Sequence, residues 1–226
     1  MKKLTIAILL LLGSFSMVSA EIGLRIGGSA EVGEFNASGT ETEGDETTAV
    51  RKEQALVGMT SWFIEKQLGF LPGPLARVSI GYSMSPDTLK TGVASRHIQD
   101  LGAAASAGVS VPADNSVSAE VSNYEQMYIT ANITDWLFVK VGSVDLDVKT
   151  TEDLDTGSTY GNTSLSGTVW GIGLNHMTDS GFFGRIEFND TSIGGTTLTA
   201  TNNTDNSVKL NDLDGTTGKV SFGKQF

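Results

Sequence analysis

Hydrophobic and polar residues alternate along most of the chain after residue 21. In residues 22–34, Ile26 and Val32 fall on one face of an extended chain, and Arg25 and Glu31 fall on the other. Strict alternation over several residues is typical of a β-strand with one apolar and one polar face. The same pattern predicts seven further strands, over residues 53–65, 75–84, 123–133, 136–148, 165–177, 182–191 and 216–226.

Two of these strands alternate imperfectly. In residues 136–148 the apolar phase slips near Gly142 and Ser143, which indicates either a β-bulge or the edge of a membrane. In residues 53–65 both faces are partly apolar. For that strand we expect the apolar face to consist of Ala55, Val57, Met59 and Phe63.

The connections between the expected strands alternate in length. Long connections (36–52, 85–122, 149–164, 192–215) alternate with short ones (66–74, 134–135, 178–181). Outer-membrane barrels have short periplasmic turns and long outer loops, and their strands need roughly 9–11 residues to cross the membrane. The sequence therefore predicts an all-β fold: an eight-stranded antiparallel up-and-down transmembrane β-barrel with long outer loops and short periplasmic turns.

The first twenty residues have the three parts of a secretory signal peptide. Two lysines precede a short apolar run at residues 4–12, and small residues end the segment at Val18, Ser19 and Ala20. We expect cleavage after Ala20 and a single barrel domain over residues 21–226. An exported barrel of this kind belongs in the outer membrane.

Composition limits the partners, metals and cofactors that we expect. The formal net charge of −11 argues against a nucleic-acid partner, which needs a basic face. The chain has no cysteine and two histidines, so we expect no metal and no cofactor. Residues 153–157 and 211–215 carry oxygen ligands at alternate positions, as calcium loops do, but turn-forming Asp–Gly pairs explain both segments more simply.

Charge decides which face of the expected barrel meets lipid. A charged side chain at mid-membrane costs roughly 2–4 kcal/mol on the lipid face, so the polar face should line the lumen. A soluble lipocalin-like barrel would have the opposite arrangement. The polar face of this chain is rich in Gly and Ser, which suit the crowded interior of a narrow barrel. The expected lumen charge cluster consists of Arg25, Glu31, Arg77, Lys140, Arg185, Glu187 and Lys219, with Glu65 as a possible further member.

Buried charges must be paired or hydrated. The nearest expected pairs join Glu187 to Arg185 and Glu31 to Arg25, two acids that follow a base on the same strand face. The lumen would then be a salt-bridged plug, although an excess of basic groups could instead favour a narrow anion-biased leak. Aromatic residues at the expected short-turn ends predict a periplasmic girdle of Trp62, Phe63, Trp136 and Phe182.

The last strand, residues 218–226, alternates apolar residues and stops at an aromatic one. With the signal peptide, the eight strands and the loop rhythm, it resembles the small bacterial outer-membrane β-barrels of the OmpA/OmpX and opacity-protein type. In that family such an ending is the signal for the barrel-assembly machinery, and Val220, Phe222 and Phe226 match it, whereas Lys224 departs from it. The resemblance implies outer-membrane lipid, lipopolysaccharide, the assembly machinery and periplasmic chaperones as partners.

Three functions remain open from the sequence. The first is a structural or surface-interaction role, with loops exposed to an extracellular ligand. The second is a narrow porin-like pore for small solutes, and the third is a lipid-modifying enzyme. We expect no enzymatic activity and no catalytic residues, because His97 with Ser95 and Asp100 is a chance grouping in a polar loop, and His176 suits a turn or girdle.

Overall fold

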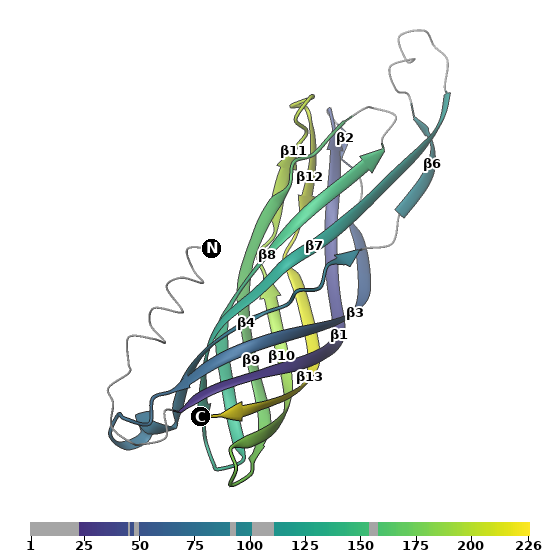
Figure 1. Ribbon diagram of the computed structural model, residues 1–226. Helices are drawn as coiled ribbons and strands as arrows, with labels where there is room; N and C mark the ends of the chain where they lie inside the picture. The colour runs from purple at the N-terminus through teal and green to yellow at the C-terminus, as the bar shows by residue number, and fades with distance from the viewer. Residues whose placement is uncertain (1–22, 45, 48–49, 91–93, 101–110, 154–157) are drawn as a thin grey trace.

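The chain forms a closed antiparallel barrel, as the sequence predicts. The computed structural model describes residues 23–44, 46–47, 50–90, 94–100, 111–153 and 158–226, so the expected signal peptide lies outside the described residues. Eight strands form a ring in which each is hydrogen-bonded to its two neighbours (Figure 1). In ring order they are β1 (Leu24–Glu43), β3 (Arg51–Gln67), β4 (Val78–Met84), β7 (Val111–Asn132), β8 (Leu137–Asp153), β9 (Thr163–Met177), β10 (Phe182–Ile193) and β13 (Leu213–Gln225).

The first and last strands close the ring. β1 pairs with β3 on one side and with β13 on the other, in an unbroken register from Arg25↔Gln225 to Asn36↔Asp214. The backbone N–H of Phe226 donates to the carbonyl of Leu24 at 2.8 Å and ends this seam. Closure satisfies the backbone groups of both strands, which a bilayer interior requires.

The strands run well beyond the length that a membrane needs. Short strands extend the ring on the long-loop side: β2 (Glu46–Thr47), β5 (Leu89–Lys90), β6 (Ala94–Asp100), β11 (Thr196–Thr199) and β12 (Asn206–Leu210). β12 continues the edge of β13 and pairs with β1, while β11 pairs with β12. The expectation that residues 36–52, 85–122 and 192–215 are loops is therefore wrong in part, because much of each segment is strand.

Short connections join the strands at the opposite end, which we call the short-turn rim. They span residues 68–77, 133–136 and 178–181, and the first contains a 3₁₀ helix, η1 (Gly73–Arg77). Gly181 has φ +84° in the last turn, a conformation that glycine adopts without strain. No helix in the described part of the chain is long and apolar enough to cross a membrane.

One stretch of the wall is incomplete. β3 pairs with β4 only from Trp62 to Gln67, so the rest of β3 towards Arg51 has no strand partner on that side among the described residues. Where the pairing stops, the carboxylate of Asp87 accepts hydrogen bonds from the backbone N–H and the hydroxyl of Thr60. A side chain thus replaces the missing strand at this point.

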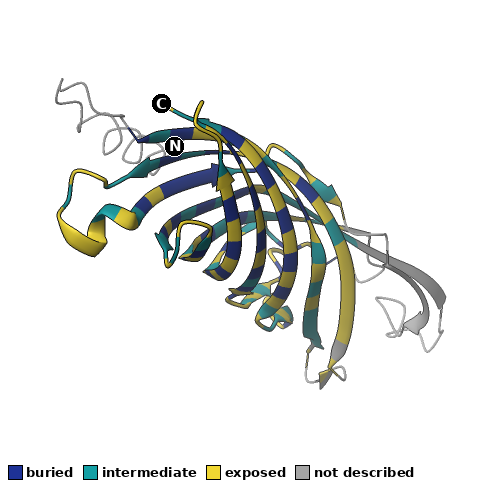
Figure 2. Cartoon of the chain, turned by 90° about the horizontal axis from the view of Figure 1, so that it is seen from below, coloured by how far each residue is buried: buried dark blue, intermediate teal, exposed yellow. Residues whose placement is uncertain are grey.

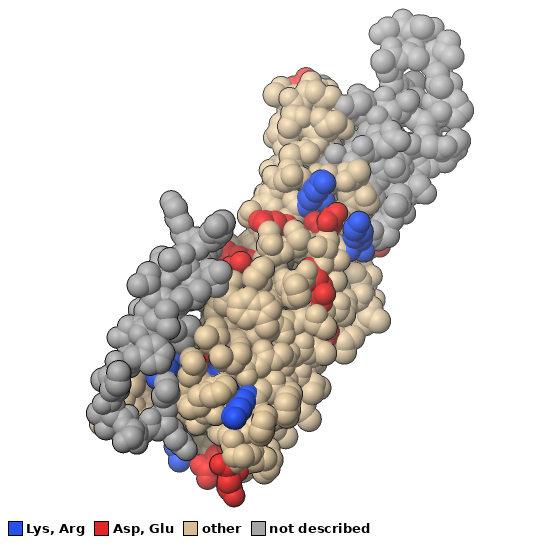
Figure 3. Space-filling model, in the orientation of Figure 1, with Lys and Arg blue, Asp and Glu red and all other residues tan. Residues whose placement is uncertain are grey.

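Burial alternates along each strand (Figure 2), and the outward residues form an apolar belt around the barrel. Its members include Ile26, Val32, Ile80, Ile129, Val139, Val141, Trp170, Ile172, Leu174, Ile186, Phe188, Val220 and Phe222. On the face that Figure 3 shows, charged side chains are sparse across the middle of the barrel and gather towards its two ends. The belt is the surface that a membrane barrel presents to lipid.

Above the belt the pattern inverts. The inward positions there are apolar and form a buried cluster, the collar, while the outward positions of the same strands are polar, such as Ser143 and Asp145 of β8. The buried members of the collar are Met59, Tyr124, Val144, Leu146, Leu165, Val169 and Ile193. An apolar interior with a polar exterior is the arrangement of a barrel in water, so the strands leave the bilayer at the inversion.

The inversion explains the phase slip that the sequence shows in β8. The register of β8 with β9 is continuous from Leu137 to Val148, so the predicted β-bulge at Gly142 and Ser143 is wrong. The apolar residues change faces because the collar begins there. The irregularity lies instead in β7, between Ser122 and Glu125.

The predicted apolar face of β3 is also wrong. Of the four residues assigned to lipid, Met59 and Phe63 are buried inside the barrel and Val57 packs against the collar, while Ala55 is exposed near the outer end of the strand. Trp62 and Leu56 point outward in their place. Glu65 is on the same inward face as Phe63 and is fully buried among charges, so a shift of one residue would turn a carboxylate towards lipid.

Candidate functional site

The lumen contains two layers of buried charge, and Glu65 is the centre of the lower one. Arg185 donates from both terminal nitrogens to the two carboxylate oxygens of Glu65, with 2.6 Å between Nη2 and Oε2. The hydroxyl of Tyr128 donates to Oε1 at 3.0 Å, and Nη1 of Arg25 lies 3.8 Å from Oε2. One carboxylate from β3 therefore holds two guanidinium groups from β1 and β10.

Amide side chains accept further hydrogen bonds from these guanidinium groups. Nε of Arg185 donates to Asn175 at 3.3 Å. Nε of Arg25 donates to Gln225 at 2.7 Å, and its Nη2 donates to Gln67 at 3.1 Å. The lower layer is thus hydrogen-bonded across β1, β3, β9, β10 and β13.

Aromatic rings enclose Arg185 on three sides. The centroids of Phe183, Phe138 and Phe63 lie 4.9, 5.3 and 5.9 Å from its Cζ atom. Such contacts stabilise a cation by about 0.5–2 kcal/mol each, more when water is excluded. All three rings are almost fully buried, so they also fill the space around the ion pair.

The upper layer contains two lysine–glutamate pairs. Nζ of Lys140 lies 3.2 Å from Glu187, and Nζ of Lys219 lies 3.5 Å from Glu31. Thr217 donates a further hydrogen bond to Glu31. These side chains are at most 6% exposed, so the charges are held away from bulk solvent.

Glycines on β9 make room for these contacts. β9 lies between β8 and β10, and it presents Gly171 opposite Lys140 and Gly173 opposite Glu187. A Cβ atom on Gly173 would lie 2.6 Å from the ring of Phe138, and one on Gly171 would lie 2.3 Å from Asn189. The side chain of Lys140 on β8 can therefore extend across β9 to Glu187 on β10.

The structure brings six of the seven expected lumen charges together, and Glu65 joins them, but it pairs them differently. The expected pairs Arg185–Glu187 and Arg25–Glu31 are not formed. Arg185 and Glu187 are two residues apart on one strand, about 6.6 Å along it, and Arg25 and Glu31 are six residues apart, about 20 Å along it, whereas residues opposite each other on neighbouring strands have Cβ atoms about 5 Å apart. Glu31 accordingly pairs with Lys219, which lies directly opposite it.

Arg77 is not in the lumen, contrary to the sequence-based expectation. It ends η1 before β4 begins, so the strand alternation does not apply to it. Its side chain is 55% exposed at the short-turn rim, donates to the carbonyl of Ile133 at 3.2 Å and lies 3.8 Å from Asp135. The lumen therefore contains four described cations and three carboxylates.

Polar side chains separate the charge layers from the collar. Gln126 donates to the hydroxyl of Tyr124 at 2.8 Å, but its Oε1 atom has no hydrogen-bond partner in the structure. Both polar atoms of the Asn189 side chain also lack a partner there. Buried polar atoms of this kind are where ordered water is found in proteins.

The predicted girdle is only partly at the rim. Trp136 is exposed in the turn after β7, and Phe182 begins β10, so both lie at the short-turn rim. Trp62 packs against Tyr82 higher in the belt, with ring centroids 5.8 Å apart, and Phe63 is inside the barrel. The sequence did not predict a second aromatic residue at the other edge of the belt: Trp170, whose indole N–H donates to Asp190 at 3.0 Å.

The residues of the expected assembly signal share the outer surface of β13. Val220, Phe222 and Phe226 are all more than half exposed there. Phe222 stacks on Phe182 with centroids 6.0 Å apart. Nζ of Lys224 lies 5.2 Å from the ring centroid of Phe182 and 5.3 Å from that of Phe226, so the lysine that departs from the family pattern lies against the rim aromatics.

On the outer surface, one acidic residue beyond the belt is tightly held. Asn123, which has φ +54°, donates to Oδ2 of Asp147 at 2.8 Å, and the hydroxyl of Ser164 donates to Oδ1 at 2.6 Å. These two hydrogen bonds lower the pKa of Asp147 below its ordinary value of 3.8.

The remaining sequence candidates form no site in the described part of the chain. His176 is exposed on the outward face of β9, and the side chain of His97 lies outside the described residues. Asn211 donates to Ser38, and Asp212 accepts from the N–H of Gly195, so both serve as turn-stabilising residues. The other calcium-like segment, residues 153–157, falls outside the described side chains.

Comparisons with known proteins identify the fold. No family model and no curated protein sequence matches the chain. The outer-membrane protein OprG of Pseudomonas aeruginosa matches over 91% of this chain and 97% of its own, with a TM-score of 0.50 and 10% identity. Neisserial surface protein A matches over 92% and 100%, with a TM-score of 0.42 and 6% identity. Ail of Yersinia pestis matches over 88% and 99%, with a TM-score of 0.35 and 13% identity.

The likeness to OprG shows the fold and leaves the function open. The OprG match spans nearly the whole of both chains, so the likeness covers the barrel as a whole. The apolar belt supplies the lipid-facing surface that the ring needs. The chain is therefore a transmembrane β-barrel with the fold of the small bacterial outer-membrane proteins.

Proposed function

We propose that the protein is a closed outer-membrane barrel that carries surface-exposed strands and loops and has a structural or surface-interaction role. The observation that carries this proposal is the filled lumen. The lower layer joins Glu65 to two guanidinium groups, and the upper layer joins two lysines to two glutamates. Above them the collar fills the interior with apolar side chains.

The blocked lumen argues against conduction. An ion would have to displace paired charges and then pass an apolar zone, where it would lose its hydration. The extended outer ends of β1, β7 and β8, together with the β11–β12 hairpin, instead give the protein a large surface beyond the belt (Figure 1). We therefore propose that these outer ends make the functional contacts of the protein. Outer-membrane lipid and lipopolysaccharide surround the barrel wall.

Planar-bilayer recordings test the closed lumen. The folded protein should give no single-channel steps in potassium chloride. A variant with both Tyr128→Ala and Phe138→Ala opens the lower layer alone and should also give no steps, because the upper layer and the collar still block the lumen. Steady anion-selective steps from the unaltered protein would establish the alternative, a narrow pore that uses the single excess cation of the lumen and the unpaired polar atoms of Gln126 and Asn189.

Cysteine labelling tests the orientation, since the chain has no cysteine of its own. Asn203→Cys at the tip of the β11–β12 hairpin should react with a membrane-impermeant maleimide on intact cells. Asp179→Cys in a short turn should react only after the outer membrane is opened. The reverse pattern, or equal labelling in a soluble periplasmic fraction, would overturn the proposal.

Assembly and catalysis complete the proposal. The outward aromatics of β13 support recognition by the barrel-assembly machinery after delivery by periplasmic chaperones. We propose no enzymatic activity, because each described lumen carboxylate is engaged by a cation and His176 is exposed on the outward face of β9, away from these carboxylates.

A further inference from the structure

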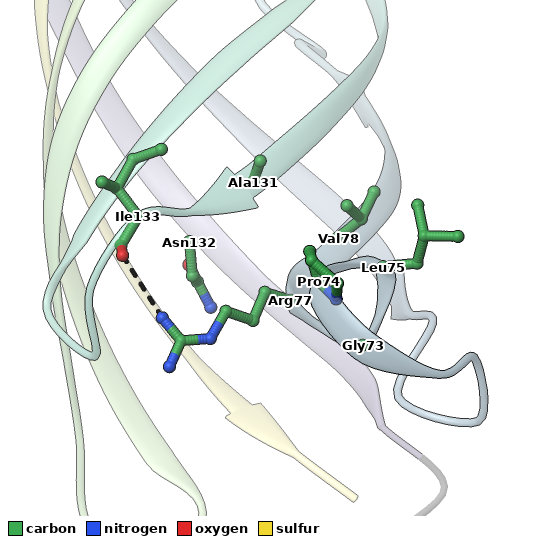
Figure 4. A pocket seen from close by; sticks show the side chains of 8 residues that line it. All are labelled: Gly73, Pro74, Leu75, Arg77, Val78, Ala131, Asn132 and Ile133. Atoms are coloured by element: carbon green, nitrogen blue, oxygen red, sulfur yellow. Dashed lines mark hydrogen bonds between the residues drawn. The ribbon is translucent and has the colours of Figure 1, made fainter.

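A hollow opens on the outside of the barrel at the short-turn rim. It lies between η1 and the end of β7, has a volume of about 620 Å³, and is open to the surroundings (Figure 4). Its walls are outward residues of β4 and of the end of β7, residues of the turn that contains η1, and Asn132, the last residue of β7. Neither the charge layers nor the outer strands contribute to it.

The upper wall of the hollow is apolar and continues the belt. Val78 of β4 pairs with Ala131 of β7, and Ile133 follows directly after the end of β7. Leu75 of η1 lies beside them and is 53% exposed. An aliphatic chain that lies along the belt would therefore meet these aliphatic side chains where it enters the hollow.

A guanidinium group forms the floor. In Figure 4 the side chain of Arg77 lies below the apolar residues, towards the end of the barrel, with its hydrogen bond to the carbonyl of Ile133. Its contact with Asp135 is long, at 3.8 Å, and that carboxylate is 97% exposed, so water screens the pair. A guanidinium has five N–H donors, and these two contacts leave room for a further acceptor.

We infer that the hollow binds a phospholipid of the inner leaflet of the outer membrane, with an acyl chain against Val78 and Ala131 and the phosphate on Arg77. The lining of the hollow is apolar next to the belt and cationic at the aqueous edge. This order matches one leaflet of a bilayer, in which acyl chains lie inside and phosphate headgroups lie at the water. Arginine suits this role because its planar fork matches the oxygens of a phosphate. Phe70, in the same short connection as η1, is also exposed and adds an apolar side chain at this rim.

The inference depends on the barrel being in a membrane and is independent of what the outer strands contact. It is also more specific than general lipid solvation. Lys224 has a positive charge at the same rim but lies against two aromatic rings and outside the hollow. General attraction of headgroups to basic residues would treat Arg77 and Lys224 alike.

Native mass spectrometry of the full folded protein, released from detergent, tests the site. With phosphatidylglycerol, the unaltered protein should retain one lipid. Arg77→Gln should weaken this binding by about tenfold, the effect of losing one charge-assisted contact of about 1.4 kcal/mol. Ala131→Phe, which fills the hollow and keeps the arginine, should weaken it similarly, whereas Lys224→Gln should bind as the unaltered protein does.

Two further probes identify the source of the phosphate. Diacylglycerol, which has the acyl chains and no phosphate, should not be retained, and glycerol 3-phosphate, which has no acyl chain, should not compete. Competition by glycerol 3-phosphate at the concentration of the lipid would overturn the lipid assignment in favour of a free-phosphate site. Equal retention by all four proteins, or equal losses in Arg77→Gln and Lys224→Gln, would overturn the site itself.

Discussion

Replacing Glu65 by Gln tests whether the lower charge layer is dry. The substitution keeps the shape of the side chain but removes the charge that holds Arg185 and Arg25. It also points an amide NH₂ group at donors that need an acceptor. Removing one partner of a buried pair costs about 3–5 kcal/mol, because the other charge stays buried without compensation.

The measurement is urea unfolding of the protein in phospholipid vesicles, followed by tryptophan fluorescence. Glu120→Gln is the matched control, since Glu120 makes a 4.0 Å surface pair with Lys90 and should contribute at most about 1 kcal/mol. We expect Glu65→Gln to lower the free energy of unfolding by several times the control value. A loss of less than about 1 kcal/mol would refute the reasoning and show that water solvates the layer.

A double variant separates charge from packing. Glu65→Leu with Arg185→Met removes the central pair and keeps apolar volume among the three phenylalanine rings. It should be more stable than Glu65→Leu alone, because only one guanidinium group, that of Arg25, is then left without its carboxylate partner instead of two. If the double variant is the less stable one, packing rather than charge pairing dominates.

Three further predictions concern other parts of the barrel. Phe226→Ala should reduce the heat-modifiable, folded fraction in outer membranes, because it removes the aromatic end of the closing strand; unchanged levels would contradict this. Gly173→Ala should destabilise by about 1–3 kcal/mol through its clash with Phe138, whereas Gly184→Ala, which has open space around it, should not. Asp147 contributes stability above pH 3.8 that is lost as the pH falls through its lowered pKa, so Asp147→Asn should flatten the acid limb of a urea-midpoint profile.

The alternation of residues predicted the architecture because membrane strands must separate charge from lipid. Arg25, Lys140 and Lys219 were placed correctly for this reason alone. The alternation also located the turn at residues 178–181, where a short polar segment interrupts two clear strands. These features depend only on neighbours in sequence, and a single chain contains that information.

The predictions were wrong where the position of a side chain depends on residues far away in the sequence. Phe63 is apolar, yet it is inside because Glu65 two residues later is held by Arg185 from the other side of the ring. Arg77 follows the polar phase but precedes its strand. The true partners of Glu187 and Glu31 depend on strand register, which one sequence does not specify.

The same strands form two parts that are stabilised in different solvents: the belt in lipid and the collar in water. The belt is held by lipid and responds to the choice of bilayer, whereas the collar is held by the exclusion of water from Val144, Leu146 and their neighbours. Its contribution should therefore weaken on cooling and in dilute urea, as hydrophobic burial does. The outer ends of the strands could then open and close while the charge layers keep the membrane part intact, so the exterior surface could change shape without breaching the membrane.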